Sequence, residues 1–208
     1  MNKPNEYDTT RAAGEFTPIE LGGHYLVIKE VRETDDNGNP LKSKNGNLMI
    51  KISIDTTDAD KQPHYFMDQF RNDIRPGKKW PNNGVIYMET ETDGKCTRNF
   101  KGFVTSVERS NPGFSVQWGD MFCQCLKNKL IGGVFREELG VYNNKETHQR
   151  KLAWFCANDK VADAAIPNPV ETREHKSWNQ SGGITSAPAD AEGFMNIPDN
   201  AQEELPFL

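Results

Sequence analysis

Alternation of apolar and polar residues predicts two β-strands in the first quarter of the chain. Residues 25–32 (YLVIKEVR) are mostly β-branched or aromatic, and a dense turn signal of Asp, Asn, Gly and Pro follows at 35–40. Residues 48–55 (LMIKISID) alternate with a period of two. One face carries Leu48, Ile50, Ile52 and Ile54, and the other carries Met49, Lys51, Ser53 and Asp55. We expect the first face to be buried and the second to be available for contacts.

The middle of the chain combines a third strand with a helix. A strand is expected at 64–71 (HYFMDQFR), after a turn at 60–63, so that the first three strands form a meander. Residues 96–109 instead have apolar side chains at i, i+3, i+4 and i+7, and the helix that this predicts ends at 111–113. A short helical turn is expected at 120–126. Its Phe122, the helix aromatics and Trp118 are assigned to the core.

Two more strands are expected at 130–138 (LIGGVFREE) and 150–157 (RKLAWFCA), joined by a polar loop at 139–149. Gly132 and Gly133 indicate a bulge or sharp bend, as barrel closure requires. Three strands, a helix and two strands is the order of an OB-fold, a five-stranded, partly open barrel that binds oligonucleotides or oligosaccharides. We therefore predict a mainly β protein with an OB-fold-like barrel and one helix between strands 3 and 4.

Charge divides the chain into a body and a tail. The net charge is −5, and residues 161–208 hold two cationic and eight acidic side chains, so the body is close to neutral. Residues 166–200 lack apolar periodicity and are rich in Pro, Gly, Ser, Ala and Asn. The prediction is one folded domain, 1–160, followed by a disordered acidic tail, 161–208.

The tail ends in two acidic residues followed by an apolar tip, a pattern typical of a docking motif. The residues are Glu203, Glu204, Leu205, Pro206 and Phe207. Pro206 favours an extended backbone, so that a shallow apolar pocket with a basic rim can take the ring while the carboxylates pair outside it. The tip resembles the C-termini of bacterial and phage single-stranded DNA-binding proteins, although here Leu208 follows the Phe and the acidic run is short. The alternative is a polar tail whose Phe is incidental.

Three strand motifs resemble those of phage-encoded single-stranded DNA-binding proteins. They are G-x-Y-x-V-I at 23–28, G-N-L-x-I-x-I at 46–52, and G-V-x-R-E-E at 133–138. The resemblance implies a protein that coats single-stranded DNA during phage DNA replication or recombination, needs no cofactor, and recruits replication or recombination proteins through its tail. It also implies a homo-oligomer. The N-terminus has no cationic segment followed by an apolar run, so we expect a cytoplasmic protein, in the host cell if it is encoded by a phage.

Binding of a single strand requires cations for phosphates and flat side chains for bases, and three segments offer both. The loop at 75–83 holds Arg75, Lys78, Lys79 and Trp80. The second group is Lys42, Lys44 and Lys51, and the third is Tyr65, Arg71, Tyr142 and Lys145. Alternatives stay open at several positions. Trp80 could instead pack on the domain as a loop anchor, and the lysines could be solvated without binding DNA. Tyr65 and Phe66 point to opposite faces of the predicted strand, so one of them is in the core, and at least one of Trp154 and Phe155 is expected there too.

Other functional classes find little support in the residues. The chain has no phosphate-binding Gly-rich loop, no H-E-x-x-H and no nucleophile elbow. Its four cysteines lack C-x-x-C spacing, which favours buried reduced thiols over disulfides or a metal site. No stretch approaches the roughly 20 apolar residues of a membrane span. The alternatives are a non-catalytic protein-interaction module, whose binding would lack a steep salt dependence, and a nuclease built from carboxylates distant in sequence.

Overall fold

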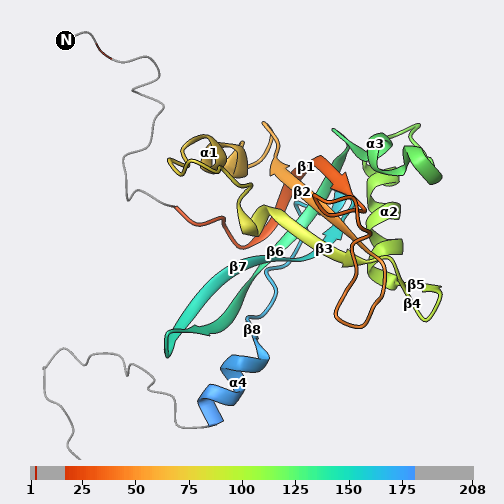
Figure 1. The fold of residues 1–208 in the computed structure, drawn as a ribbon. Helices are drawn as coiled ribbons and strands as arrows, with labels where there is room; N and C mark the ends of the chain where they lie inside the picture. The colour runs from red at the N-terminus through yellow and green to blue at the C-terminus, as the bar shows by residue number, and fades with distance from the viewer. Residues whose placement is uncertain (1–2, 4–16, 181–208) are drawn as a thin grey trace, which may run out of the picture.

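The computed structural model describes residues 3 and 17–180, and its main element is an antiparallel sheet (Figure 1). Five strands lie in the order β3-β2-β1-β6-β7, and β8 pairs with β6 in parallel. The strands are β1 (Gly22–Arg32), β2 (Met49–Thr56), β3 (Val85–Glu89), β6 (Leu130–Tyr142), β7 (Lys145–Cys156) and β8 (Val170–Glu171). A separate small hairpin consists of β4 (Glu91–Thr92) and β5 (Lys95–Cys96).

In the part of the chain that the structure describes, four helices accompany the sheet, and short 3-10 turns connect several of the elements. The helices are α1 (Tyr65–Arg71), α2 (Arg98–Ser110), α3 (Phe122–Leu126) and α4 (Arg173–Gln180). The 3-10 turns are η1 (Asn82–Gly84), η2 (Gly119–Met121) and η3 (Asn158–Lys160). Among the helices of the described residues, none has the length and apolar character of a membrane span.

The predicted strand-rich, antiparallel character is confirmed, but the sheet is open. Helix α2 lies between the third main strand, β3, and the next one, β6, as expected. Within the described residues, β3 and β7 form no strand pair, so hydrogen bonds do not close the sheet into a barrel. The two end strands therefore face a gap.

The third strand was predicted in the wrong place, because residues 64–71 form helix α1 instead. Both Tyr65 and Phe66 are buried, whereas a strand would have turned one of them outward. Helix α1 is fixed by a distant carboxylate: Asp55 on β2 accepts hydrogen bonds from the backbone N–H groups of Phe66 (3.0 Å) and Met67 (3.2 Å). The actual third strand, β3, has the sequence VIYME, whose aromatic and β-branched residues follow an Asn-Asn-Gly turn.

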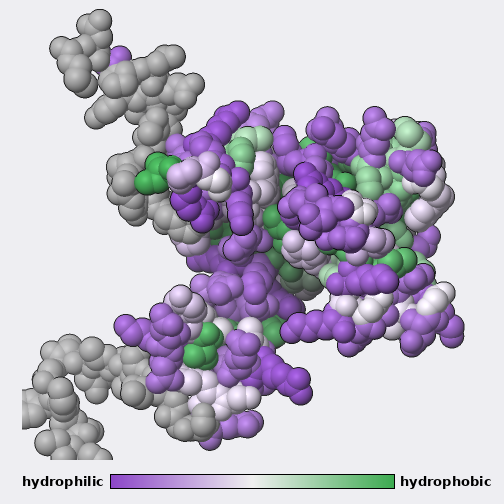
Figure 2. All heavy atoms as spheres, viewed as in Figure 1, coloured by the Kyte–Doolittle hydropathy of each residue, from purple (hydrophilic) through white to green (hydrophobic). Residues whose placement is uncertain are grey.

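The hairpin of β6 and β7 is longer than predicted, since the expected loop at 139–149 is mostly strand. Asn143 and Asn144 form its turn, with φ of 50° and 59°. Positive φ at both positions is typical of the tight turns that join antiparallel strands. The hairpin extends away from the rest of the sheet (Figure 1), and the visible surface of this region is largely hydrophilic (Figure 2).

The expected bulge near the glycines of β6 is present. The register shifts between Val134 and Phe135, directly after Gly132 and Gly133. A Cβ atom at Gly133 would come within 2.5 Å of the Leu26 side chain, and one at Gly132 within 2.5 Å of Val161. These glycines therefore allow β6 to pack closely against its neighbours.

The predicted boundary between body and tail at residue 160 lies too early. Val161 is buried, β8 pairs with β6, and α4 buries His175. Residues 161–180 therefore belong to the folded body. The predicted docking residues Glu203, Glu204, Leu205, Pro206 and Phe207 lie outside the described residues.

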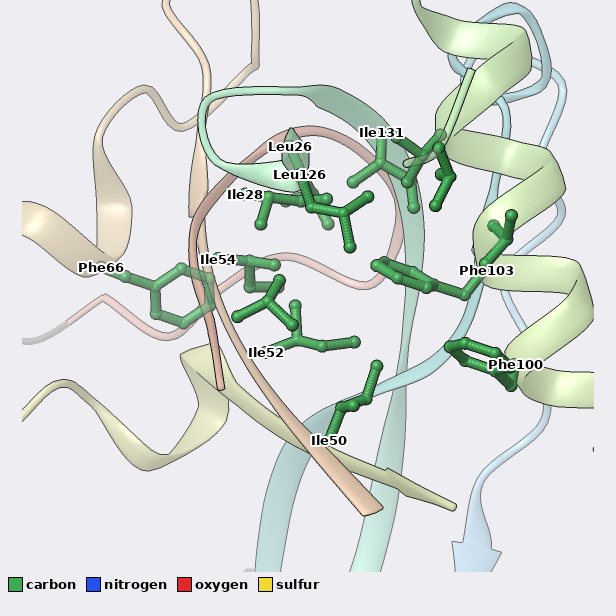
Figure 3. Close-up of a cluster of buried hydrophobic side chains, with 14 of the residues drawn as sticks. Leu26, Ile28, Ile50, Ile52, Ile54, Phe66, Phe100, Phe103, Leu126 and Ile131 are labelled. Atoms are coloured by element: carbon green, nitrogen blue, oxygen red, sulfur yellow. The ribbon is translucent and has the colours of Figure 1, made fainter. Parts of the chain in front are cut away.

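The core lies between β1, β2 and β6 on one side and α2 on the other (Figure 3). Ile50, Ile52 and Ile54 of β2 are buried as expected, whereas Leu48 at the start of this face is 41% exposed. Phe100 and Phe103 of α2 point toward these isoleucines.

Three core assignments need correction. Trp118 is 65% exposed and stacks on the buried Phe122, with ring centroids 5.5 Å apart, so the prediction that it is a core residue is wrong. Ser53 and Asp55, both expected on the available face of β2, are buried, and α1 covers Asp55. The four cysteines are free, but Cys96 is exposed and the other three are only half-buried, so the prediction of buried thiols is wrong for Cys96 and too strong for the rest.

Candidate nucleic-acid interface

A groove runs along the gap between β3 and β7. One pocket of about 510 Å³ is lined by both end strands and by the first turn of α2. A second pocket of about 1010 Å³ shares Ile86, Tyr87 and Leu152 with the first, so the two are continuous. We call this combined feature the edge groove.

A row of side chains crosses the outer face of the sheet and ends at the edge groove. Arg32 of β1 is opposite Lys51 of β2, and Lys51 is opposite Tyr87 of β3. Residues directly opposite each other in antiparallel strands project from the same face, so these three side chains are neighbours. Tyr87 is 56% exposed, and all three residues line the larger pocket. The row combines two cations with a flat, accessible ring.

Trp154 of β7 lines the groove from the opposite wall and is 48% exposed. The next residue, Phe155, packs on Phe103 of α2, with ring centroids 5.1 Å apart. Of these two adjacent aromatic residues, Phe155 therefore packs against the core, and Trp154 is exposed, which is one of the two arrangements that the sequence left open. Arg98 and Asn99, from the first turn of α2, line the same pocket as Trp154.

Trp80 occupies the position of a loop anchor, the alternative that the sequence left open. Its indole N–H donates to the carbonyl oxygen of Ile54 at 3.1 Å, and its ring lies 5.6 Å from that of Phe70. A Cβ atom on Gly84 would come within 2.9 Å of the indole nitrogen, which explains a glycine there. Trp80 nevertheless lines the edge groove beside Lys79.

The other cations of the predicted loop are partly engaged. Arg75 forms hydrogen bonds to Asp73, and the Lys78 ammonium donates to the carbonyl of Arg71 at 2.8 Å. Because Arg75 donates to it, the Asp73 carboxyl has its pKa lowered to about 2. Arg71 itself is exposed at the end of α1.

The cations of the groove differ in how far they are neutralised. Arg32 forms ion pairs with Glu30 (2.8 Å) and Asp36 (2.9 Å), and Lys151 pairs with Glu138. By contrast, no carboxylate of the described residues lies within 4.0 Å of the cationic groups of Lys51, Lys79 or Arg98. These three are the groove cations best placed to meet a phosphate.

Four predicted contact residues lie on two projecting loops rather than in the groove lining. Lys42 and Lys44 are exposed on the connection between β1 and β2, where Lys42 forms an isolated bridge with Leu48. Tyr142 and Lys145 pair at the tip of the β6–β7 hairpin, and Tyr142 is 70% exposed. Tyr65 is 3% exposed within α1, so its ring has no face free for a base. Arg71, Arg75 and Lys78 line neither pocket of the groove.

Tyr87 and Trp154 were not among the predicted contacts. Tyr87 was missed because β3 was not recognised as a strand. Trp154 was left unassigned because the pattern of β7 alone does not tell which of two adjacent aromatic residues faces outward. The register of β3 against β2 would have identified Tyr87 through its partner Lys51.

Comparisons with known proteins add no name to this geometry: no family model matches the chain, and no curated protein does. Among the described residues, no three His, Cys, Asp or Glu side chains are grouped so that they could hold a metal ion.

Proposed function

We propose that this protein is a non-catalytic single-stranded DNA-binding protein that holds the strand in the edge groove. It protects single strands during replication or recombination and recruits partner enzymes through residues 203–207. The observation that carries the proposal is the pair of exposed aromatic side chains, Tyr87 and Trp154, on opposite walls of one groove that also contains Lys51 and Lys79. Aromatic side chains stack on bases, and cations bind the phosphates between them.

The order of the strands supports an OB-type reading of the fold. The main elements follow the OB order, which is three strands (β1, β2 and β3), a helix (α2) and two more strands (β6 and β7). The sheet is open between its two edge strands, β3 and β7. OB-folds bind oligonucleotides on the face of strands 2 and 3 and with the loops that join strands 1 to 2 and 4 to 5. The equivalent surfaces here carry Lys51 and Tyr87 on the strands, Lys42 and Lys44 on the first loop, and Tyr142 and Lys145 on the second.

The test is a fluorescence-anisotropy titration of a labelled dT oligonucleotide and of a duplex. We expect tight binding to the single strand alone. Tyr87→Ala and Trp154→Ala should each weaken it by roughly 5- to 150-fold, because one stacked base contributes about 1–3 kcal/mol. The matched control is Trp118→Ala, which removes an exposed aromatic side chain that lines neither pocket of the groove.

Two results would overturn the proposal. If the wild-type protein binds no single strand at low salt, a protein-interaction module becomes the better account. If Trp118→Ala weakens binding as much as the groove variants, the groove is not the stacking site. Incubation of the labelled strand with the protein and Mg²⁺ tests the nuclease alternative, and we expect the strand to stay intact.

A further inference from the structure

Ile74, in the loop between α1 and η1, is 97% exposed, more than any other large apolar side chain of the described residues. A single exposed apolar side chain is common on protein surfaces and carries no conclusion by itself. What distinguishes Ile74 is the way in which its neighbours hold it and the charges that surround it.

The residues on either side of Ile74 are joined by a bidentate ion pair and a backbone hydrogen bond. The Asp73 carboxylate accepts hydrogen bonds from the backbone N–H of Arg75 (3.0 Å), from its Nε (2.8 Å) and from its Nη2 (2.7 Å). Hydrogen bonding to Arg75 lowers the pKa of Asp73 to about 2, so the carboxylate keeps this pairing well below neutral pH. The hydrogen bonds between residues 73 and 75 restrict the backbone on both sides of Ile74, while its side chain stays exposed. A backbone segment that is already restricted loses less conformational entropy when it binds.

The loop is attached to the edge groove at its far end. Lys78 donates to the Arg71 carbonyl, which ties the two ends of the loop together. The indole of Trp80 is hydrogen-bonded to β2, and Lys79 and Trp80 line the groove. Ile74 therefore projects from a fixed support next to the groove rather than from a free loop.

The charge of this loop favours a polyanion as its partner. Residues 71–80 contain four cationic side chains and one acidic side chain, Asp73. The cations are Arg71, Arg75, Lys78 and Lys79. An apolar side chain flanked by cations matches a nucleic acid strand, in which apolar base faces alternate with phosphates along the backbone.

We propose that Ile74 is a wedge that inserts between two neighbouring bases of the single strand held in the edge groove. The bases separate and lose their mutual stacking, while Lys78 and Lys79 lie against the flanking phosphates. This inference rests on the proposed function, and it adds a local distortion of the strand that stacking on Tyr87 and Trp154 does not require.

The experiment uses the full-length protein and a series of dA oligonucleotides with one 2-aminopurine at successive positions, whose fluorescence rises when the base unstacks. We expect saturating wild-type protein to produce a clear rise at some positions. Ile74→Ser should reduce that rise at least twofold, and the Kd for a dT strand should increase only about 2- to 5-fold. Ile74→Val, which keeps a branched apolar side chain, should retain the rise.

Ile166→Ser is the matched control, since Ile166 is also exposed (62%) but lines neither pocket of the groove. It should leave both the rise and the Kd unchanged. If wild-type protein binds dT but Ile74→Ser gives the same rise, or if wild-type binding gives none, the wedge is wrong and the binding function stands. If wild-type protein binds no single strand, the proposed function itself fails.

Discussion

Asp55 shows at the scale of one residue how this fold joins distant segments. Its side chain is almost fully buried at the end of β2, and Oδ1 accepts hydrogen bonds from the N–H groups of Thr56, Phe66 and Met67. One carboxylate thus satisfies two of the N–H groups that open α1 and have no partner within the helix. Burial nevertheless raises the pKa of Asp55, so desolvation outweighs these hydrogen bonds.

Replacing Asp55 should separate its hydrogen bonding from its charge. Asp55→Ala leaves buried N–H groups unpaired and should lower the free energy of unfolding by about 1–3 kcal/mol. Asp55→Asn keeps an oxygen acceptor, so it should cost less. Urea unfolding followed by circular dichroism measures both, and equal losses would show that the acceptor is unimportant.

The raised pKa of Asp55 also predicts a pH dependence with a definite sign. The folded state binds the Asp55 proton more tightly than the unfolded state, so the contribution is fully present below the unfolded pKa, near 3.9. It is lost as pH rises through the folded pKa. Asp55→Asn should therefore gain stability relative to wild type between pH 4 and pH 7, and a relative loss over that range would contradict the assignment.

At the scale of elements, the sequence predicted correctly the strands and helix whose apolar periodicity can be seen within the segment itself. Strands β1 and β2 and helix α2 have clear periodicity because one face of each packs against the core. The segment 64–71 fits a strand or a helix equally well, and Asp55, from another element, selects the helix. The outer half of the β6–β7 hairpin was taken for a loop because its side chains are mostly exposed or only half-buried, so no apolar alternation marks it.

The site residues follow the same rule: those marked by a local pattern were predicted, and those that depend on distant parts of the chain were not. Lys51, Lys79 and Trp80 were recognised as groove candidates because strand alternation and a cationic loop are local features. Tyr87 and Trp154 depend on the register of β3 and on the facing of β7, which are set by pairing between distant strands. The burial of Tyr65 likewise depends on the packing of α1 against the core.

Helix α4 is held against the tip of the β6–β7 hairpin by two polar contacts. The Trp178 indole N–H donates to the side-chain oxygen of Asn144 (2.8 Å), and His175 Nε2 lies 3.0 Å from a carboxylate oxygen of Glu146. Trp178→Ala should loosen the helix, because it removes one of its two polar contacts with the hairpin, the hydrogen bond to Asn144. Amide hydrogen exchange should then accelerate at least several-fold in residues 170–180 and at the turn 143–146, with β1 and β2 unaffected.

Lys176→Ala provides the control, since Lys176 is an exposed residue of the same helix. Exchange in the helix and turn should match wild type in this variant. Unchanged exchange in Trp178→Ala would mean that the hydrogen bond from Trp178 to Asn144 does not hold the helix in place.

For the whole molecule, the near-neutral body limits how large the electrostatic part of the proposed DNA affinity can be. Each phosphate contact on a single strand contributes about 0.7 to the slope of log affinity against log salt concentration. Lys51→Ala and Lys79→Ala should each reduce the magnitude of that slope by about 0.7, measured by anisotropy over a range of NaCl concentrations. Lys176→Ala should leave the slope unchanged. Identical slopes in all three variants would show that Lys51 and Lys79 do not contact phosphates.

The open edge between β3 and β7 has a consequence for which DNA sequences the groove could accommodate. Within the described residues no ladder of hydrogen bonds links these two strands, so the spacing between them can change while every strand pair of the sheet stays intact. Elsewhere in the sheet, a change of spacing would break backbone hydrogen bonds. The width of the groove is thus its most adjustable dimension, which would suit the proposed binding of a single strand whose purines and pyrimidines come in any order.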